Sequence, residues 1–282
     1  MASTIDAYIL RVTDLDRAIE FWEKVIGVEL VGRTEGDTSS EAVLRSPIGG
    51  GSVQLTRPHD DDRPVDVGHS IFRQYMQTSD SAGLYEHATK LGFDATHEPF
   101  DVPGRVNVVK SYTRDPDGYL MDLCEFQGEL LHGQVHPKNH ARNGAIATYI
   151  GQVAIYVTAL DPAVDFWTRL GITVLDRVSF NSYMELALMR GDEGTLLQLM
   201  QVMEGRERPA RTDAVMPQPG EVDLGSGIQG FRVVTDKCRR LHEQVVAGGF
   251  RSACAPSDND KAITATVLDP DGYHVEIRQP LT

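Results

Sequence analysis

The chain has 282 residues, 41% of them hydrophobic and 24% charged, which is an ordinary composition for a globular protein of about two domains. Its 27 basic and 41 acidic residues give a formal net charge of −14, which disfavours nucleic acid and anionic membranes as partners. Three scattered cysteines, no signal-peptide pattern and no long apolar stretch predict a reduced, cytoplasmic protein.

The first half of the sequence predicts two successive sets of elements. Each set begins with a strand, continues into a helix with apolar residues at helical spacing, and ends in short alternating runs. Asp14 and Asp80 stand where helix N-caps belong. The predicted elements are 8–12, 14–27, 41–46 and 52–58 in the first set, and 72–78, 79–92 and 108–126 in the second.

The second half repeats this order of elements. Residues 10–30 align with residues 155–175 at an offset of 145, and both segments contain a Phe-Trp pair. The motif DPDGY occurs at 115–119 and again at 269–273, each time before an alternating run. Because Pro sets a turn and Gly supplies a positive φ, the motif predicts a tight turn into the last strand of a module. The sequence therefore predicts four copies of a βαβββ module.

This pattern resembles the vicinal oxygen chelate superfamily, which includes glyoxalase I, extradiol dioxygenases, and fosfomycin- and bleomycin-resistance proteins. The resemblance rests on a strand followed by "DLDRAIEFW", a glycine, hairpins, and the closing "DPDGYHVE". It implies an α+β fold in which four βαβββ modules pair into two cupped barrels. We expect a first domain at 1–127, a linker at 128–147, and a second domain, with the main ligand site, at 148–282.

The resemblance also implies where a metal would be held, in the first and last strands of a module. Extradiol iron chemistry needs two histidines and a carboxylate, which this set lacks. One carboxylate among amides binds a divalent ion weakly, so we expect no metal; if one is present, its ligands would be Glu276, Gln152 and Gln198. The positions are Ala7, Gln54, Arg73 and Asp122 in the first domain, and Gln152, Gln198, Gln229 and Glu276 in the second.

Glu276 is the predicted catalytic residue, as a general acid or base for proton transfer next to a carbonyl. His274 lies two residues earlier, on the same predicted strand face. Gln152, Gln198 and Gln229 would orient substrate oxygens. The alternative is that Glu276 pairs with a neighbouring amide and only closes the barrel.

In the first domain, Arg73 and Asp122 are predicted to form a buried ion pair. The alternative is that Arg73 binds an anionic ligand. His69 resembles the histidine of metal-binding family members, but its distance from the helix start favours Arg73 for that place. The acidic run His59–Asp62 is predicted to be a solvated loop rather than a metal site.

Together these features predict a small-molecule enzyme, a metal-independent or weakly metal-binding lyase or isomerase with a carboxylate base in the C-terminal cup. One alternative is a non-catalytic protein that binds an antibiotic or aromatic ligand. A second is a divalent-metal glyoxalase-like or dioxygenase-like enzyme. The expected partner is a small molecule, and a homodimer is possible.

Overall fold

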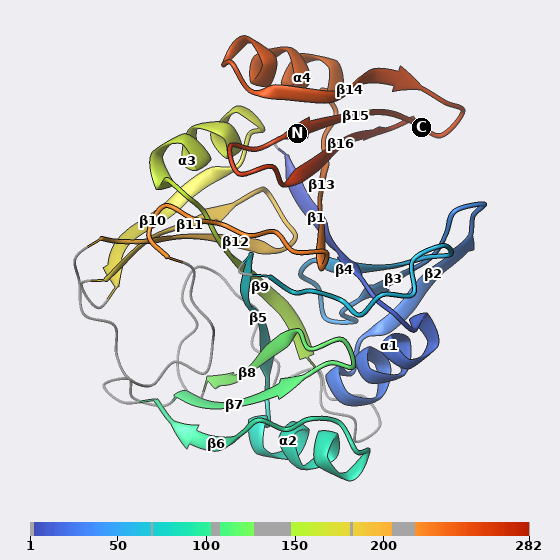
Figure 1. Ribbon diagram of the computed structural model, residues 1–282, viewed down its shortest axis with the longest axis vertical. Coiled ribbons are helices and arrows are strands. Elements are labelled where there is room, and N and C mark those ends of the chain that lie inside the picture. The colour runs from blue at the N-terminus through green and yellow to red at the C-terminus, as the bar shows by residue number, and fades with distance from the viewer. Residues whose placement is uncertain are drawn as a thin grey trace. The chain divides into compact units, whose positions relative to one another are not determined.

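A computed structural model of the chain describes residues 3–68, 70–102, 108–126, 148–180, 183–204 and 218–281 (Figure 1). Over these ranges the chain forms sixteen strands and four α-helices, and the first helix continues into a π-helical turn. The elements follow one another as four modules of a strand, a helix and three strands, which confirms the predicted repeat.

The first two modules lie in the N-terminal half. Module 1 comprises β1 (Thr4–Arg11), α1 (Leu15–Phe21), η1 (Trp22–Ile26), β2 (Glu29–Glu35), β3 (Ser39–Arg45) and β4 (Ser52–Pro58). Module 2 comprises β5 (Ile71–Thr78), α2 (Ser81–Lys90), β6 (His97–Asp101), β7 (Val108–Arg114) and β8 (Leu120–Phe126).

The other two modules lie in the C-terminal half. Module 3 comprises β9 (Thr148–Tyr156), α3 (Leu160–Arg169), β10 (Thr173–Phe180), β11 (Met184–Arg190) and β12 (Leu196–Val202). Module 4 comprises β13 (Ile228–Val234), α4 (Cys238–Ala247), β14 (Arg251–Asp258), β15 (Ala262–Leu268) and β16 (His274–Pro280).

The strands form two eight-stranded sheets, and the α+β class is as predicted. One sheet has the order β14-β15-β16-β13-β1-β4-β3-β2, and the other has β10-β11-β12-β9-β5-β8-β7-β6.

The chain divides into two compact units, which are described separately below. Unit 1 contains Met1–Ile9, Asp66–Phe72 and Val153–Thr282, and unit 2 contains Leu10–Val65 and Arg73–Gln152. The described residues of the segment Met1–Ile9 therefore group with the C-terminal half in this division, and the predicted domain limits stay predictions. The predicted linker, 128–147, lies outside the described residues, so its limits stay predictions. In the described ranges, no helix is long and apolar enough to cross a membrane.

Local sequence signals explain where the first two helices begin. The Asp14 side chain accepts a hydrogen bond from the Arg17 amide at 3.0 Å, and Asp80 accepts one from Gly83 at 2.7 Å. Both carboxylates satisfy a helix N–H that has no partner within the helix, as predicted. The π-helical turn ends at Gly27, whose φ of 77° is a conformation that glycine adopts without a steric penalty.

Each helix packs on its sheet through large apolar side chains. Phe21 and Trp22 of module 1 are fully buried, as are Phe166 and Trp167 at the equivalent place in module 3. Both pairs meet edge to face, with interplanar angles of 87° and 88°. The repeated Phe-Trp pair of the sequence is therefore a repeated core element.

The two DPDGY motifs form matching turns. Asp115 Oδ1 accepts hydrogen bonds from the amides of Asp117 and Tyr119, at 3.0 and 2.9 Å. Asp269 makes the same two bonds to Asp271 and Tyr273 at the same distances. Each turn fixes the hairpin register, and hence the placement of the side chains of the last strand.

Candidate functional site

One face of β5, β7 and β8 points away from α2 and carries a charged cluster. Ser81 of α2 lies 2.9 Å, oxygen to oxygen, from Ser111 of β7, so Ser111 faces the helix. Neighbouring side chains of a strand alternate, and Lys110 and Tyr112 therefore lie on the opposite face. This face positions the charged residues of module 2.

Strand register places Asp122 at the centre of this face. Asp122 of β8 is opposite Tyr112 on β7 and opposite Tyr75 on β5. Arg73 is two residues before Tyr75, and Lys110 two before Tyr112, so both cations approach Asp122 diagonally. The carboxylate is thus bordered by two tyrosines and two cations.

The contacts of Asp122 are close and shielded from water. Its Oδ2 atom lies 2.7 Å from Lys110 Nζ and 3.0 Å from Arg73 Nη1. The Asp122 side chain is 0% exposed, whereas Lys110 is 11% and Arg73 20% exposed. The predicted ion pair is therefore present, and Lys110 contacts the same carboxylate oxygen as Arg73.

The groups around this cluster stay protonated at neutral pH. Burial lowers the pKa of Lys110, and the nearby Asp122 carboxylate opposes this shift. Burial raises the pKa of Tyr112 to about 12 and that of Cys124 to about 11. Burial also raises the pKa of Tyr75, whose hydroxyl donates to Cys124 Sγ at 2.9 Å. Cys124 is therefore a neutral thiol at neutral pH.

Module 4 repeats the pairing of a terminal-strand carboxylate with an arginine. Glu276 of β16 is in register with Arg232 of β13, and Glu276 Oε2 accepts from Arg232 Nη2 at 3.2 Å and from Nε at 3.3 Å. Arg278 Nη1 lies 3.5 Å from the other oxygen, Oε1. Glu276 is 24% exposed, so a ligand can reach it, unlike Asp122.

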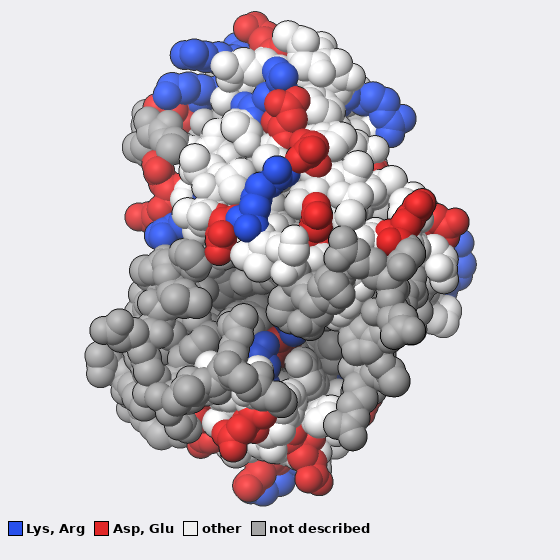
Figure 2. All heavy atoms as spheres, turned by 90° about the vertical axis from the view of Figure 1, so that its left-hand side faces the viewer, with Lys and Arg blue, Asp and Glu red and all other residues white. Residues whose placement is uncertain are grey.

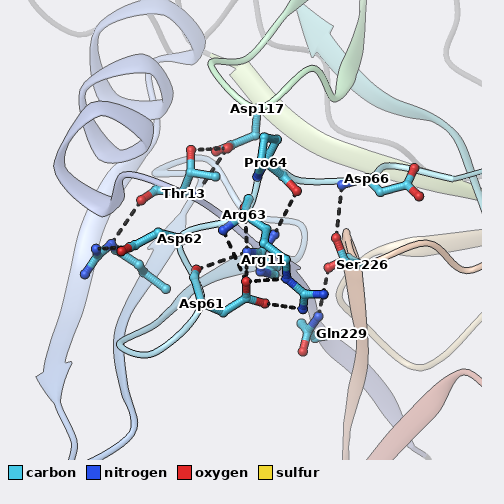
Figure 3. Close-up of polar contacts among 11 residues, drawn as sticks. Arg11, Thr13, Asp61, Asp62, Arg63, Pro64, Asp66, Asp117, Ser226 and Gln229 are labelled. Carbon is cyan, nitrogen blue, oxygen red and sulfur yellow. Dashed lines mark hydrogen bonds and ion pairs between the residues drawn. The ribbon is translucent and has the colours of Figure 1, made fainter.

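One residue predicted to lie near Glu276 does not lie beside it. Gln229 is exposed, and its Nε2 donates to Ser226 O at 3.1 Å (Figure 3). Arg232, three residues later, takes the place beside Glu276. A shift of an odd number of residues along a strand reverses the face, which explains the error. His274 shares the face of Glu276, as predicted, and is exposed.

The other predicted amides lie in module 3, and Gln54 lies in module 1. Gln198 of β12 is 8% exposed, and Gln152 of β9 is half-buried. Gln54 donates its Nε2 to Glu41 at 3.0 Å, and Ala7 is fully buried. The substrate-orienting role predicted for the glutamines stays a prediction. His69 lies outside the described residues.

The loop after β4, which contains the acidic run, is ordered around Arg11 (Figure 3). Arg11 Nη2 donates to the carbonyls of Asp61 and Arg63 at 3.1 and 2.7 Å, and Nη1 to that of Pro64 at 3.4 Å. Arg11 is only 2% exposed. Hydrogen bonds from Arg63 lower the pKa of Asp61. His59, Asp60 and Asp62 of the acidic run are exposed, as predicted, while Arg11 and Arg63 hold the loop at Asp61.

The residues at the family's metal positions do not suit a divalent cation. Asp122 and Glu276, the carboxylates of modules 2 and 4, already accept from arginine or lysine. A metal beside either oxygen would meet positive charge where it needs electron-rich ligands. In the described part of the chain, no three His, Cys, Asp or Glu side chains come together as metal ligands do.

Charged side chains of both signs are mixed on one face of the molecule. On the face shown in Figure 2, the described Lys and Arg side chains are interspersed with Asp and Glu side chains, and neither sign forms a continuous patch among the described residues of this face.

Sequence reasoning missed Lys110 and Arg232. Both could be found from hairpin or strand register: the DPDGY turn sets the pairing of β7 with β8, and this pairing places Lys110 diagonal to Asp122. A lysine at an inward position of an alternating run, "VVKSYTR", was the available signal. Arg232 required the exact start of β13, which strand prediction seldom provides.

The two sheets and the module-end carboxylates define a tandem protein of the vicinal oxygen chelate type. The family model described as Glyoxalase/Bleomycin resistance protein/Dioxygenase superfamily matches residues 4–123 and 149–277. The chain belongs to this superfamily.

Several relatives carry the name lactoylglutathione lyase. The chain is 27% identical to "Lactoylglutathione lyase GLX1" of Arabidopsis thaliana over 276 residues, which is 94% of this chain and 87% of that protein. It is 28% identical to the "Lactoylglutathione lyase" of Escherichia coli O157:H7 over 130 residues, 42% of this chain and 88% of that protein. Glyoxalase I from Zea mays has the same fold, with a TM-score of 0.78 at 21% identity, covering 99% of this chain and 92% of that one.

Proposed function

We propose that the chain is a small-molecule lyase or isomerase of the superfamily, which transfers a proton with Glu276 and needs no tightly bound metal. One observation carries this proposal: Glu276 is a partly exposed carboxylate at the end of module 4, with an arginine at each oxygen. Asp122, the equivalent carboxylate of module 2, is fully buried and cannot meet a substrate directly.

The chemistry is the removal of a proton from a carbon next to a carbonyl. Glu276 takes the proton, and the electron pair of the C–H bond moves onto the carbonyl oxygen. Arg232 and Arg278, which already lie at the carboxylate, supply N–H donors for the negative oxygen that forms. Return of the proton to the neighbouring carbon completes an isomerisation, and loss of a leaving group completes an elimination.

The names of the relatives supply the first compound to test. Because several are lactoylglutathione lyases, we propose a thioester or related acyl adduct as the substrate class, with lactoylglutathione as the probe. Turnover is measured on protein treated with a chelator and checked by elemental analysis. Activity without stoichiometric metal is expected. Activity that appears only on addition of Zn²⁺, Ni²⁺ or Mn²⁺ would contradict metal independence.

The residue assignment is tested by Glu276→Gln, which keeps the shape of the side chain and removes the base. Loss of a general base lowers turnover by about 10²–10⁴-fold, and we expect binding of lactoylglutathione to persist. Glu243→Gln, at an exposed position of α4, removes the same charge from the same unit and serves as the control. Equal turnover in the two variants would contradict the assignment of Glu276 as the base.

A second candidate is a non-catalytic protein that binds and sequesters a small molecule. The two salt bridges of Glu276 favour it, because both carboxylate oxygens are already occupied by guanidinium groups. This candidate predicts binding without turnover in the unmodified protein.

A further inference from the structure

A serine, a histidine and a glutamate meet at the β2–β3 hairpin of unit 2, away from the residues of the proposed proton transfer. Ser40 Oγ lies 2.9 Å from His59 Nε2 and donates a hydrogen bond to Glu35 Oε2. His59 Nε2 lies 3.9 Å from the same carboxylate oxygen. The three side chains therefore form one contiguous group of a hydroxyl, an imidazole and a carboxylate.

Strand pairing explains how these side chains come together. Glu35 of β2 is the register partner of Ser40 on β3, and Ser40 is the register partner of Arg57 on β4. Register partners lie side by side on one face of a sheet, so these three side chains share a face. His59 follows the end of β4, and its amide donates to Thr38 O at 2.9 Å. The backbone hydrogen bonds of the sheet and the hairpin thus place His59 beside Ser40.

The surroundings of His59 leave a lone pair for the serine. The other ring nitrogen, Nδ1, lies 3.4 Å from Asp37 O, a carbonyl that can only accept a hydrogen bond. This contact assigns the proton of the neutral ring to Nδ1, and the lone pair is then on Nε2, which faces Ser40 Oγ. His59 is therefore placed to take the proton of the Ser40 hydroxyl.

Glu35 is the other acceptor for the Ser40 proton. The hydrogen bond from Ser40, together with one from Arg33, lowers the pKa of Glu35, so this carboxylate is a weaker base than usual. A hydroxyl hydrogen rotates to suit its partners, so it can turn from Glu35 toward His59. The Glu35 carboxylate then lies close enough to stabilise a positive charge on the imidazole.

A surface pocket of about 310 Å³ adjoins Ser40. Arg33 and Arg57 also line it. Arg57 donates from Nε to Thr13 O and from Nη2 to Asp62 Oδ1, both at 3.0 Å. Its Nη1 has no hydrogen-bond partner among the described residues. Because Arg57 is the register partner of Ser40, this N–H group can donate to an oxygen bound beside the serine.

The charged groups at the pocket are paired with one another. Arg33 Nη1 lies 2.6 Å from Asp16 Oδ1, and Arg57 Nη2 lies 3.0 Å from Asp62 Oδ1. Paired charges attract a further ion only weakly, so the pocket suits a neutral ligand better than an anion or a cation. Its volume suits a small ligand.

We propose that Ser40 is a nucleophile that accepts the acyl group of a small, neutral carboxylic ester. Ser40 Oγ attacks the ester carbonyl carbon while its proton passes to His59 Nε2, and Arg57 Nη1 donates to the oxygen that becomes negative. The bond to the alcohol then breaks, the alcohol takes the proton from His59, and the acyl group stays on Ser40. Water that gives a proton to His59 releases the carboxylic acid and restores the serine. Glu35 is a positioning residue that stabilises the imidazolium.

The probe is 4-nitrophenyl acetate, a small neutral ester with a coloured leaving group. At neutral pH we expect the full chain to release 4-nitrophenolate in a burst of about one equivalent, followed by slower turnover. Peptide mass spectrometry should find the acetyl group on Ser40. Ser40→Ala should abolish the burst, and His59→Gln should slow it about 10²-fold or more, because a general base is lost.

Ser39→Ala is the matched control, because it removes the same hydroxyl from the preceding position of β3, whose side chain points to the other face. It should leave the burst unchanged. Circular dichroism checks that the variants are folded, and His59→Gln, at a side chain that is 37% exposed, carries the test if Ser40→Ala does not fold.

Three results would overturn the proposal: no acetyl group on Ser40, equal bursts in Ser39→Ala and Ser40→Ala, or an unchanged burst in His59→Gln. Glu276→Gln should keep the burst, because Glu276 belongs to unit 1. Loss of the burst in that variant would place the reaction at Glu276 and would also overturn the proposal. The proton transfer proposed for Glu276 does not depend on any result at Ser40.

Discussion

Asp122 and Glu276 occupy equivalent places at the ends of modules 2 and 4, but they differ in burial and in the groups that contact them. Asp122 is fully buried between two cations, and Glu276 is partly exposed between two arginines. A buried carboxylate of this kind stabilises the fold, whereas an accessible one can exchange its partners for a ligand. The same residue class at the same register position can thus be structural or chemical.

Replacement of Asp122 tests this difference. Asp122→Asn leaves two buried cations without their counter-charge, and we expect the free energy of unfolding to fall by about 3–5 kcal/mol. Glu276→Gln, at the partly exposed position, should cost about 1 kcal/mol or less. Urea unfolding measures both. Similar losses at the two sites would contradict the burial argument.

The DPDGY aspartates should give the protein a pH-dependent stability. Burial raises the pKa of Asp115 to about 8 and that of Asp269 to about 7, from an ordinary value near 3.8. The folded state therefore binds these protons more tightly than the unfolded state. Their contribution is complete below pH 4, and it is lost as the pH rises through 7 to 8.

We accordingly expect the free energy of unfolding to decrease between pH 5 and pH 8, measured by urea unfolding at each pH. Asp115→Asn should flatten this slope, because the amide oxygen still accepts from Asp117 and Tyr119 while no proton is exchanged. Asp60→Asn, at an exposed position, is the control. An unchanged slope in Asp115→Asn would exclude Asp115 as its source.

At the scale of elements, modules 2 and 4 differ at one buried position of their first strand. In module 2, the register partner of Gln74 on β5 is Met121 of β8. At the equivalent place in module 4, the register partner of Phe231 on β13 is Val275 of β16. Phe231 packs edge to face on Trp167, with centroids 5.3 Å apart. Gln74 is also 0% exposed, but neither the nitrogen nor the oxygen of its side-chain amide has a hydrogen-bond partner among the described residues.

Gln74→Met should therefore stabilise the chain. It removes a buried polar group without a partner and nearly conserves volume, so we expect the free energy of unfolding to rise by about 1–2 kcal/mol. Gln244→Met, at an exposed position of α4, is the control and should change little. A loss of stability in Gln74→Met would show that the amide has a role that its contacts do not reveal.

Much of each element could be predicted from the sequence, because the signals are local. Caps at Asp14 and Asp80, the Phe-Trp core pairs and the DPDGY turns are all set by residues within one turn or hairpin. The ion pair of Arg73 with Asp122 was also predicted. Lys110 and Arg232 were missed because their places depend on register between strands, where a small error in a boundary reverses the face.

At the scale of the whole molecule, the N-terminus is a part of the C-terminal unit. The carbonyl of Ser3 accepts from the Asp192 amide at 2.9 Å, and that of Ile5 accepts from Thr195 at 3.0 Å. A Cβ at Gly194 would lie 2.2 Å from the Ile5 oxygen, so this close approach requires glycine. The same kind of bridge recurs in the other half between Ile150 and Gly50, so the contact follows the repeat, but its partners are distant in sequence and no local pattern predicts it.

Deletion of residues 1–4 tests this connection. The Asp192 amide loses its acceptor, and we expect its hydrogen exchange to accelerate about fivefold or more, as is typical for the loss of roughly one hydrogen bond. The Gly118 amide, which donates to Asp115 at 3.0 Å in unit 2, is the internal reference and should be unaffected. Equal acceleration at both amides would indicate general unfolding instead.

The neighbour relation of β1 and β13 has a consequence for biosynthesis. These strands lie side by side in one sheet, although β1 is translated long before β13. Until translation reaches β13, one edge of β1 lacks its final partner and can pair with other chains. A nascent chain of this kind is expected to depend on chaperones more than a protein whose neighbouring strands are made consecutively.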